Sequence, residues 1–371
     1  SVALDIDAIE REIDEFYQQG RASNLSAERI AIDAGDTARV RGSSLHATES
    51  IEIEAVTSEI LARASTASRA ERSQQVELGY SWDMLGDNSS QDLKTLGGSL
   101  GGNISRSDSH SVEHVNAKLQ AANISLNADD DTTIEGAEIV AGDSLRINSK
   151  NLKIASVQDS TDSKTRSQGL SYSGLGAGVD AASGDSASTQ TLLTRLHGQR
   201  VEIVVDDTTR LQGAVVAAVD ADGNDNGELS LSTRTLQAGS LYNQVDSDSR
   251  SAGIHAGETS SLDYSHDVDS SQSKTLATLG SGDIRIEDVD ASDTRFLNTD
   301  ITDTEVAIYD IESHRGLAGE LDVRLLSEAG RDEIVEDWIK TEMIGNAIKI
   351  IVTNETVELS DYFDETRKYH D

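Results

Sequence analysis

Two short segments match catalytic motifs and are the first candidates for chemistry. Gly97 to Gly101 spell G-x-S-x-G, which in hydrolases presents a serine nucleophile on a turn between a core strand and a helix. His110, Glu113 and His114 spell H-x-x-E-H, which holds Zn²⁺ when a helix presents both imidazoles together. Because more glycine follows the first motif and no helical apolar face surrounds the second, we interpret them as a flexible glycine-rich turn and an exposed hairpin.

A third candidate is an acidic loop. Asp220, Asp222 and Asn224 match the first three ligand positions of a calcium loop. Asp225 stands where that loop needs glycine, and Leu231 stands where it needs the bidentate glutamate. We therefore interpret this segment as a solvated turn, with a calcium site as the alternative.

Arginines and aromatic residues are candidates for binding rather than catalysis. Arg72, Arg166 and Arg250 could fork onto an anionic glycan or a lipid phosphate, although each could equally pair with a nearby aspartate or hydrogen-bond a turn. Four aromatic residues could stack on sugars or lie at a membrane interface, or simply pack within hairpins: Tyr80, Trp82, Tyr172 and Tyr242. The sequence assigns no catalytic, cofactor-binding or metal residue, and we expect no cofactor.

The composition favours an elongated protein built of short strands. Of the 371 residues, 36% are apolar and 4% aromatic, and the 29 glycines are accompanied by no proline and no cysteine. Disulfides are thus excluded, which suits a solenoid stabilised by neighbouring coils. The net charge of -36 disfavours nucleic acid and anionic membrane surfaces as partners. No transmembrane segment or signal peptide is visible, so we expect an interior piece of a longer exported chain.

One pattern of strand and turn occurs three times with the same spacing. Apolar-x-apolar triplets begin at Ile30, Ile124 and Val201. Ten residues after its first residue, each triplet is followed by another aliphatic residue. Glycine comes at offset twelve, and a second triplet opens at offset twenty-one in the first two copies. The shared positions are Val40, Ile134 and Leu211; Gly42, Gly136 and Gly213; Leu45, Ile139 and Val216; and Ile51 and Leu145.

An insertion tests whether this repeat is real. In the third copy the second triplet, at Leu229, comes seven residues late, and the turn-rich segment 220–226 accounts for the delay. An Arg-Ser pair follows at offset forty-two in the first two copies and at forty-nine in the third. Because the register survives the insertion, we interpret each return of about twenty residues as one coil of a parallel β-helix with interior apolar ladders and a positive-φ glycine at a bend.

The segments between the repeats and the two ends of the chain differ from the coils. Alternating small or apolar and polar residues, as at Val76 and Leu78, predict hairpins protruding from the helix, with disorder as the alternative. Ile9, Ile13, Phe16 and Tyr17 show helical spacing in residues 1–24. Another helical face is expected to cap the last coil within residues 301–371: Ile334, Val335, Trp338, Ile339 and Met343. The remaining residues, 25–300, contain the repeat units, which begin near 25, 119 and 196.

The repeats resemble a known family of exoproteins. The pair DDTTRLQGAVVAA and GELSLSTRTLQAGSLYNQ is similar to the haemagglutinin repeat of filamentous haemagglutinins and contact-dependent inhibition effectors. TLATLGSGDIRIED and LDVRLLSEAGRDEIVEDW resemble the segment that follows those repeats. The resemblance covers about residues 25 to 345. It implies an all-β fold, a right-handed parallel β-helix (solenoid) with protruding hairpins, to which we add short α-helical segments at both ends.

The resemblance also implies a function. Such proteins are exported through an outer-membrane transporter of the two-partner type and displayed at the bacterial cell surface. We therefore expect a secreted, non-catalytic filament segment that contacts a target-cell outer membrane or surface receptor, for toxin delivery in contact-dependent growth inhibition. The alternatives are an adhesin stalk that binds glycans and a β-helix enzyme that degrades polysaccharides. The N-terminal secretion domain, the VENN motif and a toxin domain are not recognisable, so the choice between adhesin and toxin carrier stays open.

Overall fold

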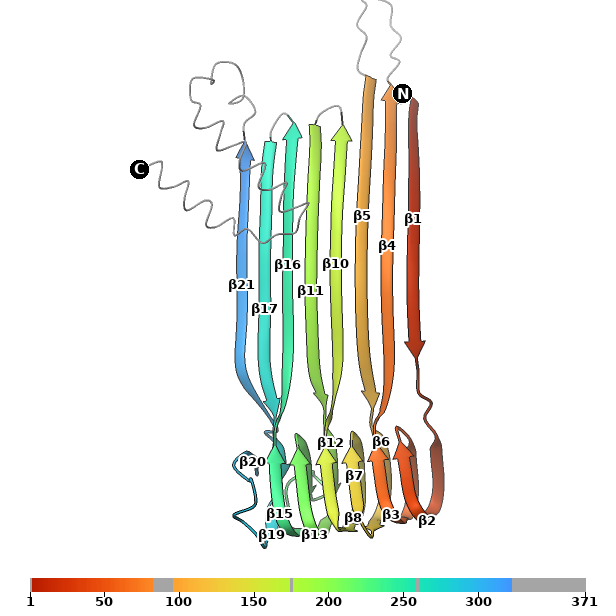
Figure 1. The fold of residues 1–371 in the computed structure, drawn as a ribbon, viewed down its shortest axis with the longest axis vertical. Coiled ribbons are helices and arrows are strands. Elements are labelled where there is room, and N and C mark those ends of the chain that lie inside the picture. The colour runs from red at the N-terminus through yellow and green to blue at the C-terminus, as the bar shows by residue number, and fades with distance from the viewer. Residues whose placement is uncertain (1, 83–95, 174–175, 258–259, 322–371) are drawn as a thin grey trace, which may run out of the picture.

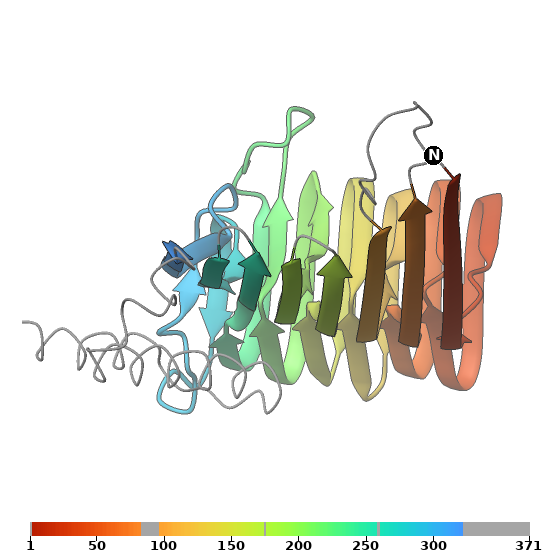
Figure 2. The same cartoon turned by 90° about the horizontal axis from the view of Figure 1, so that it is seen from above.

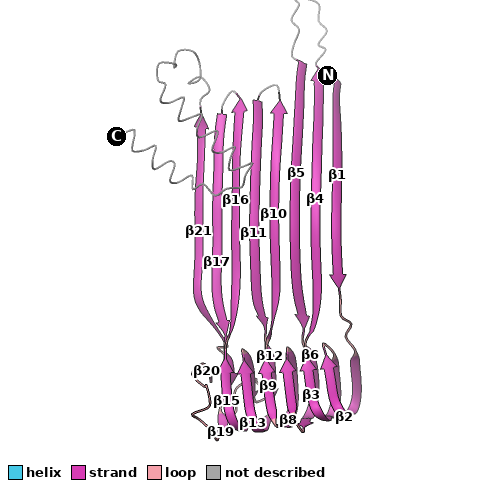
Figure 3. Ribbon diagram, viewed as in Figure 1, coloured by secondary structure: helices cyan, strands magenta, loops and turns pink. Residues whose placement is uncertain are grey.

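A computed structural model describes residues 2–82, 96–173, 176–257 and 260–321. Every regular element in this part of the chain is a β-strand (Figure 3). The strands form two sheets, one short-stranded and parallel, the other long-stranded and antiparallel (Figure 1). The all-β expectation is therefore confirmed.

The parallel sheet, here called the coil stack, has thirteen strands. Its strands are β2 Asn24–Arg41, β3 Ser44–Leu61, β6 Ala117–Ala128, β7 Asp131–Glu135, β8 Ala137–Ser149, β9 Asn151–Ala155, β12 Thr194–Gly198, β13 Arg200–Gln212, β14 Ala214–Ala218, β15 Leu229–Gly239, β18 Ala277–Leu279, β19 Gly282–Ile286 and β20 Leu297–Asn298. Seen from above, these coils follow one another in chain order (Figure 2).

The register of the coil stack confirms the repeat. Ile30 lies beside Ile51, Ile124 beside Leu145, and Val201 beside Leu229. Like residues therefore form buried ladders through the stack, such as Leu45, Leu119, Ile139, Leu196, Val216 and Leu279. The insertion at 220–226 lies outside the ladders, because Val201 and Leu229 remain paired across it. Burial of these aliphatic side chains is the main favourable term holding the coils together.

The antiparallel sheet, here called the hairpin sheet, has eight strands in the order β1-β4-β5-β10-β11-β16-β17-β21. Their bounds are β1 Val2–Gln18, β4 Arg63–Trp82, β5 Leu96–Val115, β10 Val157–Ser173, β11 Gly176–Leu192, β16 Leu241–Gly257, β17 Ser260–Thr275 and β21 Glu305–Leu321. The predicted protruding hairpins are thus confirmed. They also pair with one another into a single sheet, which the sequence did not predict.

Three glycines join the two sheets. Gly42, Gly136 and Gly213 all have positive φ, of 50°, 63° and 52°, as the repeat predicts. Each also lies against the base of a hairpin: a Cβ at Gly136 would come within 2.9 Å of the Val157 Cγ2 at the start of β10. The base of that hairpin is held by Thr194, whose hydroxyl accepts from the Gly136 amide (2.9 Å) and donates to the Ala155 carbonyl (2.7 Å).

The helix predicted near the N-terminus is wrong. Residues 2–18 form β1, which pairs with β4 along its whole length. Ile9 and Phe16 are 65% and 58% exposed, so their helical spacing serves no buried face. The hydrogen bonds offered by the edge of β4 override a local pattern that lacks a packing partner. The helix predicted around Ile334 to Met343 lies outside the described residues, and residues 305–321 of the same predicted cap form the last strand of the hairpin sheet.

Candidate functional site

The two catalytic look-alikes lie in the extended strand β5. Ser99 of the G-x-S-x-G segment stands opposite Gly79 in β4, so the predicted flexible turn is wrong, because antiparallel pairing uses these glycines as strand residues. In a strand, His110 and His114 project from one face and Glu113 from the other. The His114 Nδ1 lies 3.0 Å from the Asp159 carboxylate, and no group in the described part of the chain could hold a metal. The exposed hairpin predicted here is confirmed.

The Asp220 loop uses its carboxylate internally. The Asp220 Oδ1 accepts from the amides of Asp222 (3.0 Å) and Asn224 (2.9 Å). These bonds, the one from Asn224 foremost, lower the pKa of the Asp220 carboxyl below its usual value. The loop is therefore an exposed turn stabilised by hydrogen bonds from its own amides to the Asp220 carboxylate, as we expected from the sequence.

The three repeat arginines become part of a larger row. Residues directly opposite each other in a sheet project from the same face. Arg72 stands opposite Arg106, Arg106 opposite Arg166, and Ser183 between Arg166 and Arg250. His266 and Arg315 continue the same register. The arginine row therefore crosses seven of the eight strands: Arg72, Arg106, Arg166, Ser183, Arg250, His266 and Arg315. Glu12 of β1 lies opposite Arg72 at its end.

The row is only partly neutralised. Arg106 pairs with Asp108 (2.7 Å), and Arg250 pairs with Asp248 (2.8 Å), whose carboxylate also lies 3.2 Å from the His266 Nε2. The hydrogen bond between Arg250 and Asp248 raises the pKa of Arg250 and lowers that of Asp248. Arg72, Arg166 and Arg315 are exposed and have no ion-pair partner within the described residues. Pairing with a nearby aspartate, our simpler interpretation, therefore holds for Arg250 but not for Arg72 or Arg166.

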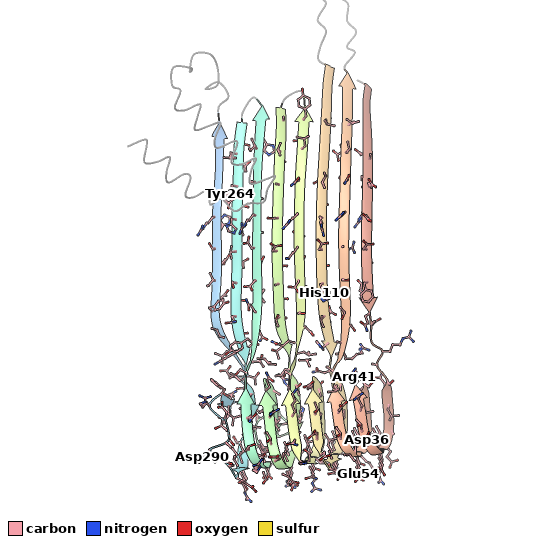
Figure 4. All side chains as sticks on the ribbon, viewed as in Figure 1. Asp36, Arg41, Glu54, His110, Tyr264 and Asp290 are labelled. Carbon is pink, nitrogen blue, oxygen red and sulfur yellow. The ribbon has the colours of Figure 1, made fainter. Side chains whose placement is uncertain are left out.

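Apolar side chains lie beyond the arginine row, farther from the coil stack and on the same face. They stand two, four and six residues beyond it along the strands, and they are 39% to 57% exposed. This apolar field consists of Ile104, Val76, Leu170, Leu78, Leu100 and Tyr172. Tyr264, in the row nearest the arginines, lies farther from the coil stack than His110 (Figure 4). One face of the hairpin sheet thus changes from charged to apolar along its strands.

The opposite face is polar at the same level. Apart from Ile9 at the edge of the sheet, its side chains are small or hydrophilic, and they line a shallow trough of about 540 Å³. The row three residues beyond the arginine register consists of Gln75, Asn103, Gly169, Asp180, Gly253 and Asp263. The hairpin strands are therefore amphipathic with period two, because apolar and polar residues alternate along them.

Sequence reasoning found only part of this site. It identified Arg72, Arg166 and Arg250 as equivalent, but missed Arg106 and Arg315, which lie in strands outside the repeat template. Of the aromatic set, Tyr172 belongs to the apolar field, whereas Tyr242 lies at the other end of the sheet, near the coil stack. The side chains of Tyr80 and Trp82 fall outside the described part of the structure.

The N-terminal part of the chain matches a known repeat family. The hemagglutinin repeat matches residues 10–170, which include β2 to β9, with their buried ladders and the β4–β5 hairpin. No curated protein and no solved structure matches the chain. Within the described residues, no helix is long and apolar enough to cross a membrane. Residues 10–170 therefore carry a hemagglutinin repeat, which is consistent with the filamentous haemagglutinin family, and proteins with this repeat are secreted exoproteins.

Proposed function

We propose that this chain is a non-catalytic segment of a surface filament that contacts another cell and associates with its outer membrane through the hairpin sheet. The observation that carries the proposal is the apolar field beside the arginine row on one exposed face. Exposed apolar surface of this extent, bordered by polar residues, is typical of a protein or membrane interaction site. The net charge of the whole chain disfavours contact with anionic membranes. This one face, however, is locally basic and apolar.

The coil stack fits the role of a rigid shaft in this proposal. We propose that it is a right-handed parallel β-helix, in which each coil adds about 4.8 Å of length. Most of its surface cations are paired between neighbouring coils, for example Lys118 with Glu138 (2.8 Å) and Lys150 with Asp130 (3.3 Å). A shaft whose charges are satisfied in this way supports the hairpin sheet without competing with it for ligands.

The family resemblance supports a finer proposal. In its toxin-delivering members, a repeat region placed like this one associates with the target-cell outer membrane. We propose the same role here, with export through a two-partner transporter, display at the cell surface and toxin delivery in contact-dependent growth inhibition. The -36 net charge is consistent with partners other than nucleic acid.

Flotation tests the membrane proposal. The purified chain is mixed with outer-membrane vesicles or protein-free liposomes and floated through a gradient in high salt, which screens surface charge. We expect salt-resistant flotation that is lost in the Leu78→Ser/Leu170→Ser variant. The matched control, Ile9→Ser/Ile13→Ser, changes two exposed apolar residues of the same sheet on the opposite face, and it should float like the parent. Equal flotation of all three proteins in high salt would contradict the proposal, as would a parent that stays wholly soluble.

The trough on the polar face favours a second candidate, an adhesin stalk that binds glycans. Amide and carboxylate groups such as those of Asn103 and Asp180 are suitable partners for sugar hydroxyls. A glycan array would test this. Binding that is abolished by Asn103→Ala/Asp180→Ala but kept by Leu78→Ser/Leu170→Ser would favour the adhesin. The absence of glycan binding, together with salt-resistant flotation, would favour membrane association.

A further inference from the structure

The arginine row is unfavourable for the sheet by itself. Like charges directly opposite each other destabilise a β-sheet, and here Arg72, Arg106 and Arg166 occupy three consecutive strands. Only Arg106 of these three has an ion pair within the described residues. The chain has 67 acidic and 31 basic residues. Three arginines side by side on neighbouring strands therefore make a locally positive surface on a strongly negative protein. Such a run is stabilised when an anion binds to it.

The surroundings of Arg166 show where the positive charge is least compensated. Two residues nearer the coil stack, where Arg106 and Arg250 have aspartates, β10 has Lys164 instead. Lys164 stands opposite Asp108 and Asp185. The negative charge of those two carboxylates is therefore shared between Lys164 and the arginine row. On the other side of Arg166 stands Ser183, a short side chain that leaves the guanidinium open to solvent. The centre of the row is therefore both cationic and accessible.

The row also lies at a defined distance from the apolar field. With about 3.4 Å per strand residue, it stands about 7 Å from the level of Ile104 and about 14 Å from that of Leu170. The polar headgroup layer of a bilayer extends roughly 5 to 7 Å beyond the hydrocarbon on each side. If Ile104 marks the hydrocarbon boundary, the guanidinium groups lie at the level of the headgroup phosphates.

We propose that the arginine row binds the phosphate groups of the lipid headgroups of the membrane in which the apolar field is buried. This inference rests on the proposed membrane association and adds the chemistry of the partner. A guanidinium forks onto phosphate oxygens with two parallel hydrogen bonds. From β4 to β21 the row extends about 29 Å across six strand spacings, so it contacts several headgroups at once and fixes how deep the sheet enters.

Vesicles of defined composition test the inference with the whole chain. Phosphatidylcholine vesicles are compared with vesicles containing phosphatidic acid, and with vesicles given equal negative charge by a fatty acid carboxylate. We expect tightest binding to phosphatidic acid. Because each arginine near an anionic surface contributes about fivefold, Arg72→Gln/Arg166→Gln should weaken this binding about 30-fold. The matched control, Arg11→Gln/Arg69→Gln, removes the same charge from the opposite face and should bind phosphatidic acid vesicles within about twofold of the parent.

The outcomes separate this inference from the proposed function. If Leu78→Ser/Leu170→Ser loses binding to all vesicles while Arg72→Gln/Arg166→Gln binds like the parent, membrane association stands and the phosphate inference fails. Equal binding to carboxylate and phosphatidic acid vesicles would also overturn it, because general charge attraction then suffices. Tight binding of soluble polyphosphate that survives Leu78→Ser/Leu170→Ser would overturn it in favour of a free phosphate polymer. Circular dichroism melts of each variant show whether the fold is kept.

Discussion

The coil stack and the hairpin sheet are built from alternating segments of one chain, yet they use their side chains in opposite ways. In most strands of the coil stack at least one side is buried: Leu126, Ile139 and Leu145 are 0% exposed. In the hairpin sheet both faces meet solvent, and Leu170 is 51% exposed. Most cations of the stack pair with acids of neighbouring coils, whereas Arg166 has no such partner among the described residues. Stability and recognition are thus separated between two sheets.

The largest expected effect comes from the ladders of the coil stack. Leu126→Ala should lower the free energy of unfolding by about 2 to 5 kcal/mol, because it leaves a cavity between coils that cannot collapse. Leu170→Ala, the same change in the apolar field, should alter it by less than about 0.5 kcal/mol. Chemical denaturation followed by circular dichroism measures both. Comparable losses would show that the apolar field is buried in solution and would remove the contrast between the two sheets.

The glycines that join the two sheets come next. Gly136→Ala should cost at least about 2 kcal/mol, because alanine is strained at φ 63° and its Cβ would meet the Ala62 Cβ. Gly142→Ala is the control, since no atom lies closer than 3.5 Å to a Cβ there. Thermal unfolding distinguishes them. A stable Gly136→Ala protein would mean that the hairpin base can move away from the coil.

The hydroxyl of Thr194 gives a somewhat smaller effect at the same junction. Thr194→Val keeps the shape of a fully buried side chain but removes the hydroxyl bonds to the Gly136 amide and the Ala155 carbonyl, which then keep only the backbone bond between them (3.0 Å). We expect a loss of about 0.5 to 1.5 kcal/mol, the net contribution of a typical intramolecular hydrogen bond. Hydrogen exchange should show faster exchange at the base of β10 and β11 than in the ladders. Thr161→Val, at an exposed position of β10, should leave both unchanged.

The coil stack was predictable from the sequence because its information is local. Apolar triplets, a glycine at offset twelve and a return after about twenty residues determine which residues are buried and which are stacked. The insertion at 220–226 preserved the pattern, since it lies in a solvent-exposed turn. The helix predicted at Ile9 to Tyr17 was wrong because these residues pair with the edge of β4 instead. No local sequence pattern reveals that this edge is available.

The arginine row was only partly predictable because it depends on pairing between distant hairpins. A signal existed: Arg72 comes nine residues after Arg63, and Arg106 nine residues before Val115, the residue paired with Arg63. Arg166 and Arg250 likewise stand nine residues after the first residues of β10 and β16. Counting from the hairpin base would therefore have aligned the row. The position of that base, however, was visible only after Gly42, Gly136 and Gly213 were seen to contact it.

The smallest expected effect concerns a place where the hairpin sheet, like the coil stack, pairs a cation with an acid. Arg250 lowers the pKa of Asp248, so the carboxylate contributes stability above its unfolded pKa of about 3.9, and this contribution is lost as pH falls through the lower folded value. Because the side chains are 35% and 38% exposed, solvent screening keeps the contribution below about 1 kcal/mol. Between pH 5 and 3 the parent should therefore lose slightly more stability than Arg250→Gln. Identical pH profiles would mean that the Arg250–Asp248 pair does not stabilise the fold in solution, and that Arg250, like Arg166, is free to bind an anion.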